Sequence, residues 1–510
     1  MSGGVNRTLQ SKLSEIFSVK DFGAVGDGIT IDTTAIQTAF NTGNDIYLPA
    51  GTYRTTGTIS ITNSNQTVWG AGNSTVIAPD AGTYNIIQIG TSAAETINNT
   101  VKDFTVYPTS AMTDGAAIKL VRASRLQLAN IKCGSLDRYL ANGTRFYDGL
   151  DVAGVAWGNI LVSNCDFIGG THYGIQMSSG DNNGSEIQFT DNCTVRNDWQ
   201  RAIYIGGGCG GVDFDSIDVV ESVTGLWVDD ARAGIVNREL LSTSMFTIDT
   251  CTSIGAYFGP NSIVYSRMTG TWFGGNDGEQ ILIVSGQPST SYFVFDGCHV
   301  DGGNKEGFKI SDGAVRISNC VITNNGRDNA TGGHGIHFTP SFNDGAIVSD
   351  NIIERNGITT AGSAHPSVGN GVYIQTSARN VQVDNNIISF NARYAVQVDA
   401  GCSATTITNN NIFSNVAGSI LHNRGINFTN KVSNNLGYIT EQAGTATIVS
   451  GANSVTVSHN LAGINNVQVT PFQASQADFY ATNLTGSSFD IVINASAGAD
   501  RNFFWLARIM

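Results

Sequence analysis

The feature that most constrains the fold is a short phrase that recurs through the middle of the chain. In each copy a small residue is followed by an apolar, a variable and a second apolar residue, as in GIQM (174–177) and GIHF (335–338). Successive copies from residue 174 to residue 398 begin 23 to 36 residues apart. The period-two alternation within each copy predicts a short β-strand with one buried face.

A second phrase lies between these copies. VRISNCVI (315–322), AIVSDNII (346–353) and VQVDNNII (381–388) each join two short apolar stretches through an Asn-type turn. Short strands at this spacing, with no helical periodicity between them, predict a parallel β-solenoid. Because parallel crossovers prefer one hand, we expect an all-β, right-handed parallel β-helix with neighbouring strands about 4.8 Å apart.

Asn and Cys recur at the turn of the second phrase. Alignment of the phrases places Asn351, Asn386 and Asn411 at one position, where each amide can bond to the next. On the same line in earlier copies we place five cysteines: Cys165, Cys193, Cys251, Cys298 and Cys320. We interpret these as reduced, buried thiols, because the chain has no CxxC motif. We expect no metal and no cofactor.

Charge and hydropathy exclude several partners. The chain carries 27 Lys and Arg against 41 Asp and Glu, a net charge of −14, which argues against nucleic acid. No stretch reaches the ~18 consecutive apolar residues of a membrane span, so we expect no membrane insertion. The first residues, MSGGVNRTLQSKLSEIF, lack the apolar centre of a signal peptide, which predicts synthesis in a cytosol.

Residues 19–55 read VKDFGAVGDGITIDTTAIQTAFNTGNDIYLPAGTYRT. This segment resembles the entry motif of the pectate-lyase-like superfamily as it occurs in bacteriophage tailspikes, where DFGAVGDG precedes a capping helix and PAGTY forms a strand. It departs from the family at Ile31, where an acidic residue is usual. From the residues alone, Asp32 or Thr33 can N-cap a helix whose apolar face, with Ile36 and Phe40, closes the open end of the solenoid.

The chain divides into three regions. We expect residues 1–18 to form a neck or linker, residues 19–430 the parallel β-helix with its cap, and residues 431–510 a C-terminal β-rich domain. The last region has longer alternating strands and resembles the β-sandwich or β-prism trimerisation domain that ends many tailspikes. This resemblance implies a homotrimer that attaches to the phage baseplate or tail through an N-terminal adaptor. We expect the apolar run at 503–505 to be buried between chains.

The variable residue of the first phrase should face solvent, because the apolar residues on either side point inward. These positions form an outward column: Gln176, Tyr204, Trp227, Tyr257, Leu282, Lys309, His337, Tyr373 and Gln397. Stacked aromatic rings can pack against the faces of sugars. We therefore assign substrate binding to Tyr204, Trp227, Tyr257, His337 and Tyr373. A loop or another subunit that covers this face is the alternative.

Two glutamates are the first candidates for catalysis. Glu279 and Glu306 directly precede the outward strand in adjacent copies, and Asp277 lies at the same corner as Glu279. Backbones about 5 Å apart would bring the two carboxyl groups close, and their repulsion would raise one pKa. A protonated carboxyl beside an ionised one is what glycoside hydrolysis requires.

Two other pairs of acids compete with these glutamates. Asp229 and Asp230 follow the strand of Trp227, and the insertion after them carries two arginines able to hold an acidic sugar. We assign Asp229 and Asp230 to substrate binding. Asp198 and Glu221 share a corner in adjacent copies.

The resemblance implies a tailspike of the virion that acts at the host surface. We expect it to bind and hydrolyse a bacterial surface polysaccharide, either capsule or O-antigen. One alternative is a tail adhesin that binds the glycan without cleaving it. Another is a polysaccharide lyase, which would use His337 or Lys309 as a base on a uronate.

Overall fold

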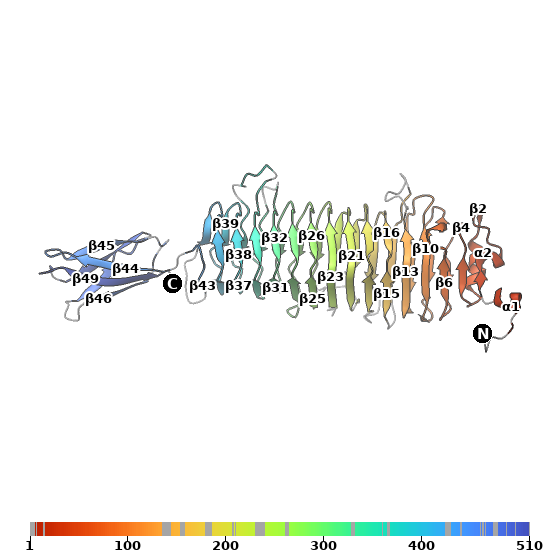
Figure 1. Ribbon diagram of the computed structural model, residues 1–510, viewed down its shortest axis with the longest axis horizontal. Coiled ribbons are helices and arrows are strands. Elements are labelled where there is room, and N and C mark those ends of the chain that lie inside the picture. The colour runs from red at the N-terminus through yellow and green to blue at the C-terminus, as the bar shows by residue number, and fades with distance from the viewer. Residues whose placement is uncertain are drawn as a thin grey trace.

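The structure is a computed structural model. It describes residues 6, 8–13, 16–134, 144–153, 159–178, 186–206, 209, 211–229, 240–260, 265–327, 332–359, 361–364, 368–423, 430–438, 441–459, 461, 464, 466–472, 478–485, 487–494 and 496–508. The chain is mainly β, with a right-handed solenoid of ~13 turns followed by small antiparallel sheets, so the predicted fold class is confirmed. Figure 1 shows the turns, or coils, stacked along a rod.

One 14-stranded parallel sheet forms a face of the solenoid, and it contains the first repeated phrase. Its strands in chain order are β5 (Ile59–Ile61), β8 (Ile87–Ile89), β11 (Ala116–Val121), β14 (Asp148–Ala153), β17 (Tyr173–Ser178), β20 (Arg201–Ile205), β22 (Thr224–Val228), β24 (Ala256–Phe258), β27 (Ile281–Ile283), β30 (Phe308–Ile310), β33 (Ile336–Phe338), β36 (Val372–Ile374), β39 (Tyr394–Val398) and β42 (Gly418–His422).

A 27-stranded sheet folds around the rest of each coil and contains the second phrase. Its strands are β1 (Phe17–Ser18), β2 (Asp27–Ile31), β3 (Ile46–Leu48), β4 (Gly51–Thr55), β6 (Thr67–Gly70), β7 (Thr75–Pro79), β10 (Thr100–Val106), β13 (Leu126–Cys133), β15 (Ile160–Ser163), β16 (Asp166–Ile168), β18 (Ile187–Thr190), β19 (Cys193–Arg196), β21 (Val212–Val220), β23 (Leu240–Asp249), β25 (Tyr265–Thr269), β26 (Trp272–Gly274), β28 (Tyr292–Asp296), β29 (His299–Asp301), β31 (Ala314–Ser318), β32 (Val321–Thr323), β34 (Ala346–Ser349), β35 (Ile352–Glu354), β37 (Val381–Asp384), β38 (Ile387–Ser389), β40 (Thr405–Thr408), β41 (Asn411–Phe413) and β43 (Asn430–Ser433). A small pair, β9 (Thr96–Ile97) and β12 (Ala123–Ser124), lies apart from both sheets.

The N-terminal end is closed by helix α2 (Thr33–Phe40), which buries Ile36 and Phe40 as predicted. Asp32 holds the N-cap position without a side-chain bond to the helix. Its carboxylate instead accepts the backbone N–H groups of Val25 and Gly26, at 2.7 and 3.0 Å, and so fastens the loop before the helix. The other helical segments are α1 (Leu9–Leu13), η1 (Val19–Phe22) and η2 (Gly72–Ser74). Among the described residues, no helix has the length and apolarity to cross a membrane.

An asparagine ladder runs inside the solenoid, but its register differs from the prediction by one residue. Asn351 donates to Asn386, Asn386 to Asn410 and Asn410 to Asn435, at 2.8–2.9 Å between amide nitrogen and oxygen. Asn411 instead begins β41, opposite Ile387. The inward Ile407 pairs with Val383 and so sets the register, which the run of three asparagines concealed.

A second ladder, which we did not predict, links Asn325, Asn356, Asn391 and Asn415 at 2.9–3.0 Å. Cys251 belongs to the column of this second ladder and not to that of the first, because its backbone N–H donates to the side-chain oxygen of Asn276. All eight cysteines are free and buried, which confirms the interpretation as buried thiols.

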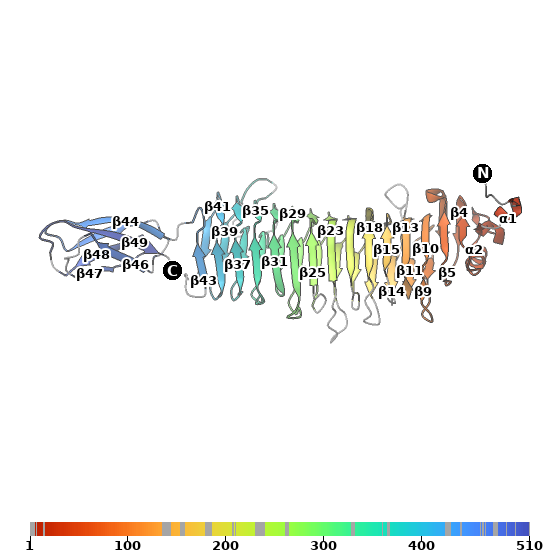
Figure 2. The same ribbon diagram turned by 60° about the horizontal axis from the view of Figure 1, so that its bottom comes forward.

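The tail forms two three-stranded antiparallel sheets beyond the last coil (Figures 1 and 2). Their strands are β44 (Glu441–Ile448), β45 (Ser454–Ser458), β46 (Asn466–Pro471), β47 (Phe479–Thr482), β48 (Ser488–Ile493) and β49 (Arg501–Arg508). Parallel pairing continues through β43, so the coils extend a few residues past the predicted boundary at residue 430.

The expectation for the aromatic run of the tail is wrong in part. Phe503 and Trp505 are buried in the tail's own core and are not available to another chain. Only Phe504 is exposed, because alternation along β49 turns it to the other face of the sheet.

Candidate functional site

The strand register confirms that the predicted residues form one column, but His337 and Gln397 are buried and do not face solvent as expected. Tyr204 pairs with Trp227, Trp227 with Tyr257 and Tyr257 with Leu282. The line continues through Lys309, His337, Tyr373 and Gln397. One face of the 14-stranded sheet therefore presents aromatic rings in its middle coils and polar groups in its later coils.

The aromatic half of the column is stacked. The rings of Trp227 and Tyr257 lie 3.9 Å apart between centroids, and those of Tyr173 and Tyr204 lie 4.8 Å apart. The guanidinium of Arg201 lies 4.0 Å over the Trp227 ring and 5.1 Å over that of Tyr204. The cation therefore joins Tyr204 to Trp227, Tyr257 is joined by stacking on Trp227, and Tyr173 extends the rings toward the N-terminus.

Asp229 follows Trp227 and accepts its indole N–H at 3.4 Å, so it orients the ring. Asp230 and the two arginines of the insertion lie outside the described residues. Asp198 and Glu221 are neighbours, as predicted from their shared corner. However, Asp198 is exposed and forms an ion pair with Arg145 at 2.9 Å, which is the geometry of a solvated corner.

The polar half begins with Glu279, whose residue is 4% exposed. Its carboxylate lies between two ammonium groups, 3.3 Å from that of Lys309 and 3.5 Å from that of Lys305. Asp277 is exposed and accepts the side-chain amide of Asn304 at 3.0 Å. The corner therefore contains one buried, paired acid and one acid in solvent.

Glu306 is 3% exposed, and its carboxylate lies 3.2 Å from Nδ1 of His337. Burial raises the pKa of the Glu306 carboxyl, but the hydrogen bond and charge of His337 and the charge of Lys309 outweigh it. The net effect is a pKa below the ordinary value. The upward shift that we expected in the glutamate pair is therefore wrong for Glu306.

Tyr373 follows on the next coil. Its hydroxyl donates to Asp399 at 2.6 Å, and its ring stacks on that of His337 at 4.9 Å between centroids. Burial raises the pKa of the Tyr373 phenol, and Asp399 raises it further. Nε2 of His337 lies 2.9 Å from the amide oxygen of Gln375.

A common pattern joins these contacts. Three consecutive outward side chains are each held by a carboxylate: Lys309 by Glu279, His337 by Glu306 and Tyr373 by Asp399. We call Lys309, His337 and Tyr373 the outward triad. Its ammonium and imidazole are positioned by the buried Glu279 and Glu306 and its phenol by the half-buried Asp399, and this arrangement can neutralise an anion and move protons.

Two families match the chain. The family described as rhamnogalacturonase A/epimerase, pectate lyase-like, matches residues 16–226, and the family described as right handed beta helix region matches residues 244–462. The chain is a pectate-lyase-like right-handed β-helix.

Short segments of this β-helix also resemble curated proteins. Mannuronan C5-epimerase AlgE3 of Azotobacter vinelandii is 42% identical over 106 residues, which are 18% of this chain and 6% of that protein. Mannuronan C5-epimerase AlgE5 of the same organism is 52% identical over 46 residues, 8% of this chain and 5% of that protein. The chain therefore spans only a small part of the length of the curated relatives it matches.

Solved structures share the fold at low identity. A mutant tailspike protein of E. coli bacteriophage HK620, in complex with a hexasaccharide, is 13% identical with a TM-score of 0.51, over 100% of this chain and 96% of that one. The A-module of Azotobacter vinelandii mannuronan C-5 epimerase AlgE6 is 16% identical with a TM-score of 0.42, over 82% and 98%.

A further polar group of the β-helix lies before the aromatic half, and we did not predict it. Asp148 is buried and lies 2.9 Å from Nδ1 of His172, and burial raises the pKa of its carboxyl. Asp151, on the same strand, forms an ion pair with Lys119 at 2.6 Å. The ring of His172 stacks on Tyr173 at 3.7 Å between centroids, so this group adjoins the aromatic rings.

The residues that we missed share a sequence signal. Gln375 and Asp399 each stand two positions after an outward residue, as Asp229 stands after Trp227. Side chains two apart on a strand face the same side, so each can reach the outward residue or its neighbour. Within the described ranges, no three His, Cys, Asp or Glu side chains converge as a metal-binding group.

Proposed function

We propose that this protein binds a polysaccharide along the outward column and modifies it at the outward triad. The observation that supports this most is one continuous face on which stacked rings lead into a lysine, a histidine and a tyrosine, each held by a carboxylate. The ring edges can contact sugars, and the triad supplies acid–base groups beside them. The hexasaccharide of the HK620 tailspike and the epimerase names of the curated relatives agree with a carbohydrate substrate.

The reaction that the geometry favours is elimination at a uronic acid. The Lys309 ammonium would pair with the sugar carboxylate and so ease removal of the adjacent C5 proton. Glu306 holds Nδ1 of His337, so Nε2 would take that proton once the substrate displaces the Gln375 oxygen that now contacts it. The Tyr373 phenol, whose O–H now donates to Asp399, would turn that O–H to O4 and give it the proton as the C4–O4 bond breaks. The product carries a C4–C5 double bond, whereas an epimerase would return a proton to C5.

Hydrolysis by Glu279 and Glu306, with Asp277 beside them, is the second candidate. It is favoured by the position of both glutamates in adjacent coils at the corner below the column. Hydrolysis needs one protonated carboxyl, whereas the Glu306 pKa is lowered and Glu279 lies between two ammonium groups. For this reason we favour elimination over hydrolysis.

The biological setting that we propose is a homotrimeric phage tailspike acting on a capsule or O-antigen outside the host cell. The tailspike-like motif of residues 19–55 supports this setting, and so does the fold shared with the HK620 tailspike. A tail adhesin that binds without catalysis would use the same aromatic rings.

The products identify the reaction. Mannuronan, polygalacturonate and host surface polysaccharide are incubated with the protein and analysed by mass spectrometry, ultraviolet absorbance and NMR. Elimination gives a conjugated double bond, epimerisation changes the sugar composition without shortening the chain, and hydrolysis gives saturated new ends. We expect Lys309→Gln, His337→Gln and Tyr373→Phe each to lower kcat by about a hundredfold or more. The control is Leu282→Ala in the same column.

Wild-type rates in all three triad variants would exclude the triad. Saturated products that disappear in Glu279→Gln and Glu306→Gln would instead establish hydrolysis.

A further inference from the structure

We infer that Arg201 is a second anion-binding group on this face, which holds the carboxylate of a sugar unit several units away from the outward triad. This role rests on the proposed binding of a polysaccharide along the column. It adds a requirement on the substrate, which must carry carboxylates along its length and not only at the reacting unit.

The contacts of Arg201 leave its charge available. Its guanidinium lies over three rings, at 4.0 Å from Trp227, 5.1 Å from Tyr204 and 5.6 Å from Tyr173. Nη1 donates to the Tyr173 hydroxyl at 3.3 Å, the one side-chain hydrogen bond of Arg201 within the described ranges. Among the described residues, no carboxylate lies within 4.0 Å of it. A guanidinium has five N–H donors, so most of them remain for a ligand.

The rings also fix the orientation of this cation. Stacking on aromatic faces restricts the guanidinium plane, and a planar fork of N–H groups matches both oxygens of a carboxylate. The ordering cost that a long, free side chain pays on binding is therefore reduced. Both faces of Trp227 are covered, by Tyr257 and by Arg201, so a sugar would lie along the ring edges, and its carboxylate would then lie beside the fork.

The distance to the triad sets the length of substrate required. Arg201 begins β20 and Lys309 lies in β30, and the sheet order between them is β20–β22–β24–β27–β30. Four steps of about 4.8 Å give about 19 Å along the axis. Because the guanidinium lies over Trp227 on β22, three of these steps, about 14 Å, remain to be spanned by a sugar chain that contacts Arg201 and the triad together.

The test measures binding of mannuronan oligosaccharides of increasing length to the full chain by titration calorimetry. For oligosaccharides that exceed the span, we expect Arg201→Gln to weaken binding by about tenfold to a hundredfold. Arg201→Lys should bind more weakly than the parent and more tightly than Arg201→Gln, because lysine keeps the charge but lacks the planar fork of N–H groups. Oligosaccharides whose carboxylates have been reduced to alcohols should bind the parent and Arg201→Gln equally.

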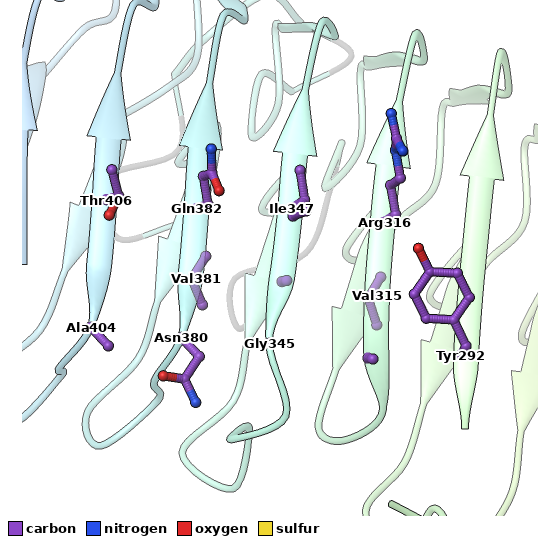
Figure 3. A pocket seen from close by; sticks show the side chains of 12 residues that line it. Tyr292, Val315, Arg316, Gly345, Ile347, Asn380, Val381, Gln382, Ala404 and Thr406 are labelled. Atoms are coloured by element: carbon purple, nitrogen blue, oxygen red, sulfur yellow. The ribbon is translucent and has the colours of Figure 1, made fainter. Parts of the chain in front are cut away.

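Arg316→Gln is the matched control. Arg316 is exposed in β31, in a shallow groove on the flank of the other sheet with Tyr292, Ile347 and Gln382 (Figure 3). Arg316→Gln removes one positive charge, as Arg201→Gln does. Because Arg316 lies off the column, this substitution should leave binding unchanged.

Three results would overturn the role of Arg201. One is equal weakening of acidic and reduced oligosaccharides by Arg201→Gln, which would show that the cation only supports the rings. Another is an effect that does not depend on length, and the third is failure of the parent to bind any acidic oligosaccharide. Failure of the proposed reaction is seen separately, as polysaccharide that stays unmodified although its binding depends on Arg201.

Discussion

His334 makes the stability of the molecule depend on pH. Burial lowers the pKa of this imidazole from 6.5 to about 3, and its Nδ1 accepts the backbone N–H of Asn370 at 3.1 Å. The unfolded chain binds a proton near pH 6.5 whereas the native state does not, so stability is full above that pH and falls as the pH decreases toward 3. Glu306, whose pKa is lowered, acts in the same direction below its ordinary 4.5.

We therefore expect the melting temperature to fall on acidification from pH 7 to pH 4, and to fall less in His334→Gln. Differential scanning calorimetry of both proteins across this range provides the measurement. An identical pH profile in the variant would show that other groups control the transition.

Trp227 provides a direct test of recognition by rings. It is half-buried, stacked on Tyr257 at 3.9 Å and covered by Arg201 at 4.0 Å. Trp227→Ala should weaken glycan binding by about 1 to 3 kcal/mol, because it removes both the ring edge at the proposed binding face and the surface that holds Arg201. Titration with the natural polysaccharide and a thermal melt are compared. A large fall in melting temperature with unchanged affinity would assign the ring to packing.

The residues of the column could be predicted from sequence because the apolar residues on either side of each one fix which face it takes. The contacts of Glu306 at the corner could not be predicted in this way. There the alternation is broken: a Cβ at Gly307 would meet Asn325 and Ile322 inside the solenoid, and the next residue, Phe308, is also buried. Because Gly307 and Phe308 both point inward, Glu306 lies on the outward side beside His337. A strict alternation of inward and outward residues does not predict this position.

At the scale of the element, the later coils are fixed to one another by asparagines. The Asn386 side chain donates to Asn410, Val348 and Asp384 and accepts from Asn351, while 1% of the residue is exposed. The existence of the ladder could be predicted from the recurring turn. Its register could not, because Asn409, Asn410 and Asn411 are chemically equal and the inward Ile407 decides between them.

Asn386→Ala should lower the free energy of unfolding by about 3 kcal/mol or more, because it leaves buried backbone and amide groups without partners. Gln382→Ala, on the exposed side of β37 just before this turn, should change it by about 0.5 kcal/mol or less. Denaturant unfolding of the two variants beside the parent gives both values. Equal effects would show that the ladder adds no more than an exposed contact.

At the scale of the whole molecule, the solenoid and the tail have separate apolar cores. The period of the repeat predicted the solenoid, and the motif of residues 19–55 predicted its cap. Alternation along β49 turns Phe504 to one face of the sheet and Phe503 and Trp505 to the other. The composition of this run, without the alternation, predicts a single apolar patch. Phe504 is 54% exposed and stacks at 4.0 Å between centroids on Phe472, which is 47% exposed.

This exposed pair identifies the face of the tail that would hold a homotrimer together. The face belongs to the sheet β44–β49–β46 and continues through Ala443, Thr445 and Leu506, with few charges to desolvate. Phe504→Asp should therefore shift the protein from trimer to monomer in light scattering. Tyr480→Asp, on the other sheet and 50% exposed, should leave the trimer intact.

Removal of residues 441–510 tests the same interface without relying on one side chain. The truncated chain keeps the whole solenoid core, so we expect it to remain folded and to be monomeric or to aggregate. A trimeric truncated protein would move the interface to the solenoid flank, where Tyr265 and Tyr292 stack in the open and continue into the groove of Figure 3. Tyr292→Asp in the truncated chain would then be the variant that dissociates it, because it places a charge in the centre of that flank.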